Sequence, residues 1–363
     1  MCTHLANHFE LHFFIFGPHQ SIDNLQNKGK FGKIFSSDML SGFLKTTNKL
    51  GYRMARKVFP PHFDSKRYAP DSILKEISYI QQKENYEACI VHTPLLGRCL
   101  QAFPGTVVRI IDSHDIWHQK YLNFKSLGYG KLLSQFRNKD KEINLYRSVD
   151  LVLAISLWDH KYLVEHGVNS IYTPVSFKPE PLPAKEPTGH DLLYASGKGI
   201  TNIDALHYFI GKIMPIVKRQ IPYLRLKISN VSDEIRNKYS GRPDIVFLPF
   251  FDDAHDAYRG ADIVIVPLRY ASGLKIKVLE SFSLGKPTIV SPAAAQGIPV
   301  AEYAQERISI NPDIFAEELI NALRDQRYRK KLSMSGLAII NNNYSPELVY
   351  KDIINHIFHE KSP

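Results

Sequence analysis

Short apolar stretches alternate with longer segments of helical periodicity along most of the chain. In the first half the apolar stretches are LHFFIF, ACIVHT, VVRIID and LVLAIS, and helices are predicted near 72–83 and over 131–147. Strands that alternate with helices in this way are typical of a parallel sheet covered by helices on both faces. The first half of the chain is therefore predicted to form a doubly wound α/β domain.

A proline-rich stretch from Pro174 to Pro187 interrupts this alternation and is typical of an interdomain linker. Beyond it come the apolar stretches DLLYAS, LRLKIS, DIVFLPF, ADIVIVPL and PTIVSP. Helices are predicted over 202–217, 274–284 and near 314–323, followed by terminal helices to about 359. The expected architecture is α/β, with two doubly wound domains that face each other across a cleft and bind ligands at the carboxyl ends of the strands.

Length and composition fit two domains. The 363 residues correspond to about two domains of roughly 150 residues, and a hydrophobic content of 44% is sufficient for two cores. Three scattered cysteines exclude a disulfide framework, and no CxxC motif or Cys/His cluster predicts a structural zinc site. We expect neither a signal peptide nor a membrane span, because the opening stretch lacks a basic region and no apolar run approaches 18 residues.

Positive charge is concentrated near the amino end. Residues 28–67 contain ten Lys or Arg and two Asp, so they carry +8 of the net charge of +10. Apolar and basic residues at helical spacing predict a basic amphipathic helix over 40–59. This helix either binds an anionic membrane surface or presents an ordinary solvated face. We expect no nucleic-acid partner, because no RRM, KH or zinc-finger signature accompanies the charge.

The segment 261–292 contains the clearest evidence of a ligand-binding site. Lys275 and Lys277 fall in the first turn of its predicted helix, where the helix dipole disfavours cations by roughly 0.3–1 kcal/mol each. A bound anion, with phosphate as the obvious candidate, would explain both lysines. In the alternative interpretation Lys277 pairs with Glu280, three residues further along, and Lys275 is solvated.

The run SGLKIKVLESFSLGKP at 272–287, with the strand before it and Gly297 after it, closely resembles the nucleotide-sugar site of family 4 glycosyltransferases, which have the GT-B fold. Three further stretches agree with this family: DSHD at 112–115, SVDLVLAIS at 148–156 and YRGADIVIVPL at 258–268. The resemblance covers roughly residues 85–350 and is most specific over 258–292. It implies transfer of a sugar from a nucleotide donor, with retention of configuration and without a metal.

Carried over onto this sequence, the resemblance gives several residues a role in donor binding. Glu280 accepts hydrogen bonds from both ribose hydroxyls, a task that suits a carboxylate because it is an acceptor only. The backbone amides of Gly273 and Leu274 hold the diphosphate. Lys275 and Lys277 lie beside it and stabilise the leaving group.

Of two further positions near the donor, Ser272 departs from the family pattern and Lys198 agrees with it. Ser272 stands where the family has a glutamate near the sugar, which leaves the sugar contact to the backbone that follows. Lys198, in the SGKGITN loop after DLLYAS, is expected to contact the phosphates. Thr201 or Asn202 is expected to cap the helix that this loop precedes.

His114 follows the strand VVRIID and is expected, by the resemblance, to hydrogen-bond to the donor sugar. In the alternative interpretation it is a structural histidine held by Asp112 or Asp115. The two aspartates could equally cap a helix or act as general base for the acceptor hydroxyl. We assign no protein nucleophile.

The resemblance also sets the domain assignment. Residues 1–175 are expected to form a Rossmann-like acceptor domain, 176–345 a Rossmann-like nucleotide-sugar domain, and 346–363 a terminal helix that packs back on the first domain. Family members start with a strand, a glycine-rich loop and a helix. This chain begins in what resembles the end of that helix, so the first domain is expected to lack its first strand.

The expected function is hexosyltransferase-type transfer from a UDP- or GDP-sugar to a saccharide or lipid-linked acceptor in cell-surface polysaccharide assembly, with no cofactor and no metal. The enzyme is expected in the cytoplasm, peripheral at the inner face of the plasma membrane through residues 40–59. One alternative is a catalytically inactive nucleotide-sugar-binding or scaffold protein, which Ser272 and the absent loop favour. Another is a nucleotide-sugar 2-epimerase, which the KVLE-type block and the lack of clustered acidic and histidine residues disfavour.

Overall fold

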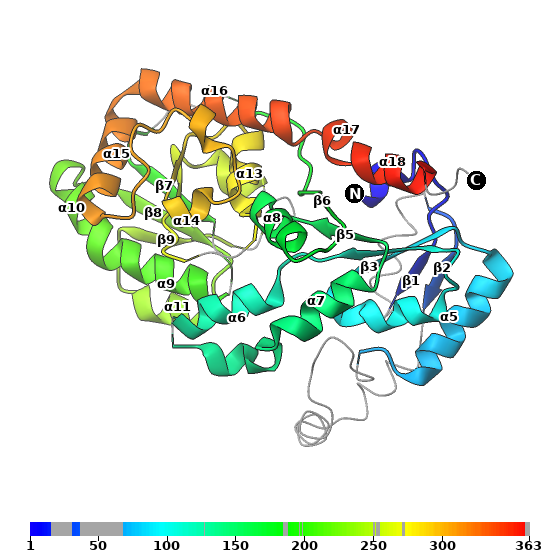
Figure 1. Ribbon diagram of the computed structural model, residues 1–363. Helices are drawn as coiled ribbons and strands as arrows, with labels where there is room; N and C mark the ends of the chain where they lie inside the picture. The colour runs from blue at the N-terminus through cyan, green and yellow to red at the C-terminus, as the bar shows by residue number, and fades with distance from the viewer. Residues whose placement is uncertain are drawn as a thin grey trace. The chain divides into compact units, whose positions relative to one another are not determined.

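The computed structural model forms two compact units (Figure 1). Unit 1 comprises the described residues of Met1–Pro174 and Val349–Pro363, and unit 2 comprises those of Val175–Leu348. The described residues are 1–15, 31–36, 68–126, 128–183, 188–195, 197, 199–249, 251, 255–270 and 273–359. The predicted basic helix over 40–59 lies outside them.

Unit 1 contains two parallel sheets. The smaller pairs β1 (Phe13–Ile15) with β2 (Ile34–Ser36). The larger has the order β3-β4-β5-β6, formed by Ala88–His92, Val108–Asp112, Leu151–Ala154 and Ser170–Tyr172. The helical elements are α1 (Cys2–Leu5), α5 (Asp71–Glu84), η1 (Pro94–Ala102), α6 (Trp117–Ser126), η2 (Gly130–Phe136), α7 (Lys139–Arg147), α8 (Leu157–Glu165) and α18 (Lys351–His359).

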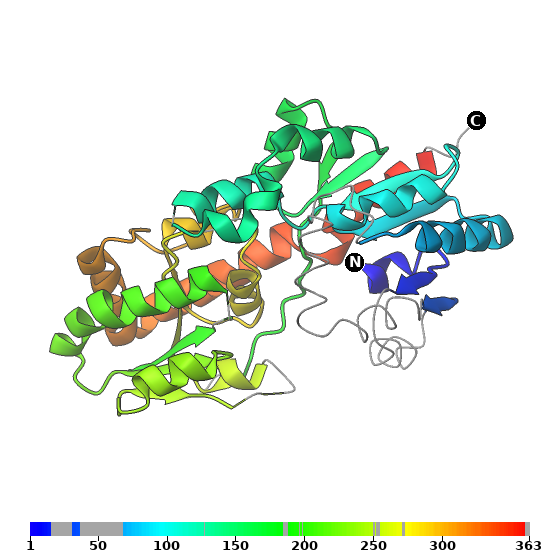
Figure 2. The same cartoon turned by 90° about the horizontal axis from the view of Figure 1, so that it is seen from below.

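Successive residues of the central strands point to opposite faces of the larger sheet, as the pleat of a strand requires. Ile111 joins a core with buried side chains of α5, η1, α7 and α8. Ile110 joins a second core with Leu5 of α1 and Ile353 of α18. In Figure 1, α5 and α18 accordingly lie on opposite sides of the strands, and Figure 2 shows the same unit from the side of α5. Both faces are covered, which explains why Ile110, Ile111 and all four residues of β5 are apolar.

If unit 1 lacks its first strand, as predicted, the effect should be visible at β3, which forms one edge of the larger sheet. Among the described residues β3 pairs with β4 alone, and the β1–β2 pair forms a separate sheet. Residues 16–30 and 37–67 are not described. The absence of a first strand therefore stays a prediction.

Unit 2 has one five-stranded parallel sheet in the order β11-β10-β7-β8-β9. Its strands are β7 (Asp191–Ala195), β8 (Arg225–Ser229), β9 (Ile245–Phe247), β10 (Ile263–Val266) and β11 (Thr288–Val290). Its helical elements are α9 (Ile200–Tyr208), η3 (Phe209–Ile213), α10 (Met214–Gln220), α11 (Asp233–Tyr239), α12 (His255–Arg259), α13 (Ile276–Ser283), α14 (Pro292–Ala295), η4 (Val300–Glu302), α15 (Pro312–Arg324) and α16 (Gln326–Asn343). Helix α17 (Pro346–Val349) follows where the chain returns to unit 1.

The strand order of unit 2 reverses between β7 and β10. The chain runs outward from β7 to β8 and β9, and then returns to place β10 and β11 on the other side of β7. In open α/β sheets ligands bind at the carboxyl ends of the strands where this reversal occurs. The chain that follows β7 leads into α9, and the chain that follows β10 leads into α13. The topology therefore places the starts of these two helices at the ligand-binding edge.

Helix α13 packs against α16, which runs beside it along unit 2 (Figure 1). The two helices approach closely at Gly336, where a Cβ atom would lie 2.9 Å from the Phe282 ring. Phe282 is fully buried. Only a glycine leaves room for this ring, so the contact fixes the position of α13 on the sheet.

The proline-rich stretch, predicted as an interdomain linker, is held to unit 2 where it is described. Its described part, residues 175–183, belongs to unit 2. The amides of Glu180 and Leu182 donate to the carbonyls of Ser283 and Leu284, at 2.8 and 3.1 Å. The last carbonyls of a helix have no partner within it, so this segment supplies the missing donors at the end of α13.

Candidate functional site

The start of α13 differs slightly from the prediction. The helix begins at Ile276 rather than near 274, because Gly273 adopts a φ of 60° and Lys275 is the N-cap residue. A positive φ of this size favours glycine. The Lys275 Nζ donates to the Gly273 carbonyl at 2.8 Å, and Leu274 between them is buried. The carbonyl of Lys275 accepts from the amides of Val278 and Leu279, at 2.9 and 3.4 Å, so only the amides before them remain at the open start of α13.

Lys277 lies in the first turn of α13 and reaches across to α9. Its Nζ donates to the Asn202 Oδ1 at 2.6 Å and lies 5.3 Å from the centre of the Tyr194 ring. Burial, with a further contribution from the charge on Lys275, lowers the pKa of Lys277 to about 8. Lys277 is thus a partly desolvated cation at neutral pH. Such a group gains more from a neighbouring anion than a solvated lysine does.

Glu280 lies about 6 Å further along the helix axis than Ile276. The Tyr258 hydroxyl of α12 donates to its Oε2 at 2.6 Å. Burial raises the pKa of Tyr258 well above its usual value, so Tyr258 keeps its proton and remains a donor. A carboxylate has several acceptor positions, so Tyr258 orients Glu280 and leaves it able to accept from a ligand.

These contacts bear on the alternative interpretation, in which Lys277 pairs with Glu280. Lys277 bonds to Asn202 and Glu280 bonds to Tyr258, so the two do not form the simple surface ion pair. Asn202 also does not cap α9, and neither does Thr201, because the N-cap residue is Gly199. The prediction of those caps was wrong. Lys198 and Ser272 lie outside the described residues, so their roles stay predictions.

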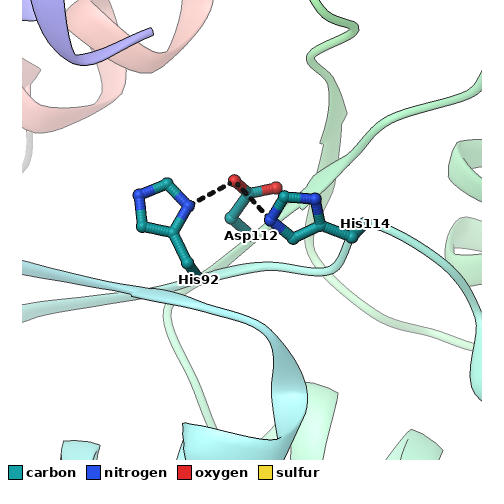
Figure 3. A group of neighbouring side chains, drawn as sticks. All are labelled: His92, Asp112 and His114. Carbon is teal, nitrogen blue, oxygen red and sulfur yellow. Dashed lines mark hydrogen bonds and ion pairs between the residues drawn. The ribbon is translucent and has the colours of Figure 1, made fainter. Parts of the chain in front are cut away.

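A second group of polar side chains lies in unit 1. His114 follows β4 with a φ of 54°, and its Nε2 lies 3.4 Å from the Asp112 Oδ2. The same oxygen lies 2.9 Å from the Nδ1 of His92, at the end of β3 (Figure 3). Hydrogen bonds to Asp112 and Cys2 raise the pKa of His92 to about 10. Of the two aspartates considered for His114, Asp112 is therefore the one that holds it.

Asp115, the second aspartate considered for His114, pairs with a lysine of α6. Its Oδ2 accepts from the Lys120 Nζ at 2.6 Å. The next helix, α6, is capped from a distance by Glu142 of α7, which accepts from the amides of Trp117 and His118, each at 2.7 Å. Glu142 is fully buried, and this burial raises its pKa to about 7. Neither Asp112 nor Asp115 is needed as the cap of α6.

Sequence comparisons match part of this chain to a known family. Residues 189–325 match a family model described as glycosyl transferases group 1. A Klebsiella pneumoniae protein, described as an uncharacterized 44.6 kDa protein in the cps region, is 22% identical over 308 residues, with 78% of this chain and 76% of that protein covered.

Solved structures share the fold. Anabaena HepE in complex with UDP has a TM-score of 0.65 and 11% identity, with 97% of this chain and 100% of HepE covered. Sucrose-phosphate synthase from Thermosynechococcus elongatus has a TM-score of 0.62 and 14% identity, with 96% and 98% covered. TarM of S. aureus has a TM-score of 0.64 and 13% identity; 78% of this chain is covered, and the chain spans 58% of TarM. Residues 189–325 therefore form a glycosyltransferase group 1 domain, and the chain has the GT-B fold.

Proposed function

We propose that this chain transfers a sugar from a nucleoside diphosphate donor to a saccharide or glycolipid acceptor in the assembly of a cell-surface polysaccharide. The observation that carries the proposal is the arrangement on α13. Two lysines lie at its start, one of them desolvated, and a carboxylate oriented by Tyr258 lies one turn further along. Amides and cations at a helix start suit a diphosphate, and a carboxylate suits vicinal hydroxyls such as those of ribose.

The proposed reaction retains the configuration of the sugar and uses no metal, as the family resemblance implies. Lys275 and Lys277 then supply the positive charge that stabilises the leaving diphosphate. His114 is assigned to the donor sugar, and Lys198 to the phosphates. Ser272 replaces a carboxylate near the sugar, so the backbone at Gly273 and Leu274 makes the contact there.

The comparisons support the choice of ligands to test. HepE and the pneumococcal O-GlcNAc transferase GtfA have both been crystallised with UDP, together with glucose and GlcNAc respectively. The Klebsiella pneumoniae relative comes from the cps region, which supports a polysaccharide product. We therefore propose UDP-sugars as the first donors to examine and GDP-sugars as the second.

Calorimetry with uridine and UDP tests the site. In the Glu280→Gln variant both affinities are expected to fall by about 1–3 kcal/mol, because the charged acceptor for the ribose hydroxyls is lost. In the Lys275→Met/Lys277→Met variant only UDP binding should weaken, since uridine carries no phosphate. The exposed Glu306 provides a matched control, and Glu306→Gln should bind both ligands as the wild type does.

Two results would contradict this assignment. If Glu280→Gln binds both ligands with wild-type affinity, Glu280 does not contact the ribose. If the double lysine variant loses uridine and UDP binding equally, the lysines do not contact the diphosphate. Turnover of a bound UDP-sugar with an acceptor separates a transferase from a protein that only binds the donor.

We further propose that the predicted basic helix over 40–59 holds the enzyme at an anionic membrane surface. None of the described helices is both long and apolar enough to cross a bilayer. The protein is expected to float with vesicles that contain phosphatidylglycerol at low salt and to be released at high salt, because exposed charges are screened. A Lys49→Gln/Arg53→Gln variant should bind less. Binding that is absent at low salt, or that salt does not change, would disprove the idea.

A further inference from the structure

Three side chains of unit 1 converge at the carboxyl ends of two neighbouring strands. In the register of the parallel sheet His92 of β3 lies opposite Asp112 of β4, so the two side chains are cross-strand neighbours. The chain then turns back at His114, whose left-handed backbone returns its ring toward the same carboxylate (Figure 3). One ligand-type atom of each residue lies within 4.8 Å of the other two. The sheet register, rather than chance contact on the surface, brings these groups together.

The spacing of the three groups matches that of ligands around a small metal ion. Bonds of about 2.0–2.2 Å at tetrahedral angles place neighbouring ligand atoms roughly 3.3 Å apart. The Asp112 Oδ2 lies 2.9 Å from the His92 Nδ1 and 3.4 Å from the His114 Nε2. A metal ion beside this oxygen would displace the proton that the His92 Nδ1 shares with Asp112, after which both imidazoles can direct a lone pair at the ion. Both histidine side chains are about half exposed, at 49% and 52%, so their rings have room to turn toward it.

We propose that His92, Asp112 and His114 bind a divalent transition-metal ion of the zinc type. Two imidazole nitrogens and one carboxylate oxygen are borderline ligands that suit zinc and its neighbours, whereas magnesium and calcium prefer oxygen ligands alone. Three protein ligands leave a coordination position for water, and the exposure of both histidines gives water access to it. The proposed transfer of sugar does not use this ion, and a bound ion would compete with the contact to the donor sugar that is assigned to His114 above.

Cys2 makes a contact that would support the site. It hydrogen-bonds to His92, on the side of unit 1 where α1 begins. Histidine ligands of metals usually bond through their second ring nitrogen to another protein group, which orients the ring. Cys2 provides such a partner. Loss of a partner of this kind typically costs 10- to 100-fold in metal affinity.

This inference departs from the sequence-based expectation of no metal. That expectation was based on the family resemblance and on the absence of CxxC motifs and Cys/His clusters along the chain. His92 and Asp112 are 20 residues apart, and only the pairing of β3 with β4 makes them neighbours. Local spacing therefore could not reveal the group.

Titration of the full, metal-free chain with Co²⁺, followed by its visible absorption, tests the proposal. We expect one saturable site, from which Zn²⁺ displaces Co²⁺ and Mg²⁺ does not. Asp112→Asn and His92→Gln should each weaken binding by more than about tenfold, and Cys2→Ser should weaken it by roughly tenfold. His190→Ala removes a histidine of unit 2 and should leave binding unchanged.

Thermal unfolding of each metal-free variant shows whether it is folded. Two ligand positions are substituted separately, so that the proposal can still be tested if one of the variants does not fold. The proposal is overturned if the wild type shows no saturable Co²⁺ site. It is also overturned if folded His92→Gln protein binds Co²⁺ as tightly as the wild type, or if Mg²⁺ competes as well as Zn²⁺ does.

Discussion

Replacing Lys277 with methionine is expected to lower kcat for sugar transfer by about 100- to 1000-fold, the effect of removing one group that stabilises developing charge. Methionine has a similar length and keeps the packing over Tyr194, so the main loss is the charge beside the diphosphate. The assay is steady-state transfer from the best UDP- or GDP-sugar. Lys212→Met, at an exposed lysine of the same unit, is the control and should retain wild-type activity.

The pH profile of the same enzymes gives a second test of Lys277. Its pKa of about 8 means that kcat/KM should decline as the pH rises above about 8, because the free enzyme loses the cation there. Arginine stays protonated over this range, so Lys277→Arg should show no such decline. Activity of Lys277→Met within tenfold of the wild type, or the same alkaline decline in Lys277→Arg, would remove Lys277 from the reaction.

The free energy of unfolding is expected to fall as the pH rises from about 4.5 to 7, because of Glu142. Burial raises the pKa of Glu142 from 4.5 to about 7 in the folded protein. The folded state therefore binds more protons than the unfolded state in this window, and stability decreases as protons leave. At 1.36 kcal/mol for each pKa unit, the Glu142 contribution is roughly 2–4 kcal/mol.

Urea unfolding at several pH values, in the wild type and in Glu142→Gln, isolates this contribution. Histidines titrate in both proteins, so their effects cancel in the difference. Glutamine stays neutral, and the stability of Glu142→Gln relative to the wild type should rise by roughly 2–4 kcal/mol between pH 4.5 and 7.5. The exposed Glu317→Gln should keep the wild-type profile. An unchanged difference across this range would mean that Glu142 titrates normally.

Much of the fold follows from local sequence pattern. The apolar stretches LHFFIF, DLLYAS and PTIVSP each contain an observed strand, because buried parallel strands need apolar side chains on both faces. The short strand β6 was not predicted, since its three residues carry too little pattern. The helix predicted over 131–147 is in fact two elements, η2 and α7, because Asn138 caps a new helix there.

The candidate site, like the fold, could be predicted only in part from local sequence. Lys277 and Glu280 could be found because they share one helix and a recognisable motif. Their partners Asn202 and Tyr258 lie 75 and 22 residues away in the sequence, and His92 lies 20 residues from Asp112. Such contacts are determined by strand order and helix packing, which local periodicity does not contain. Tyr258 had one signal, since it begins the YRGADIVIVPL stretch that carries the family resemblance.

The attachment of residues 175–183 to the end of α13 means that unit 2 extends beyond the segment that matches the family model. The family is recognised over 189–325, but a fragment with those limits would lack the amides of Glu180 and Leu182 and the whole of α16. The carbonyls that end α13 would then lose their donors, and Phe282 would lose the surface formed at Gly336. We therefore expect a fragment that spans Val175–Leu348 to fold more stably than one limited to 189–325.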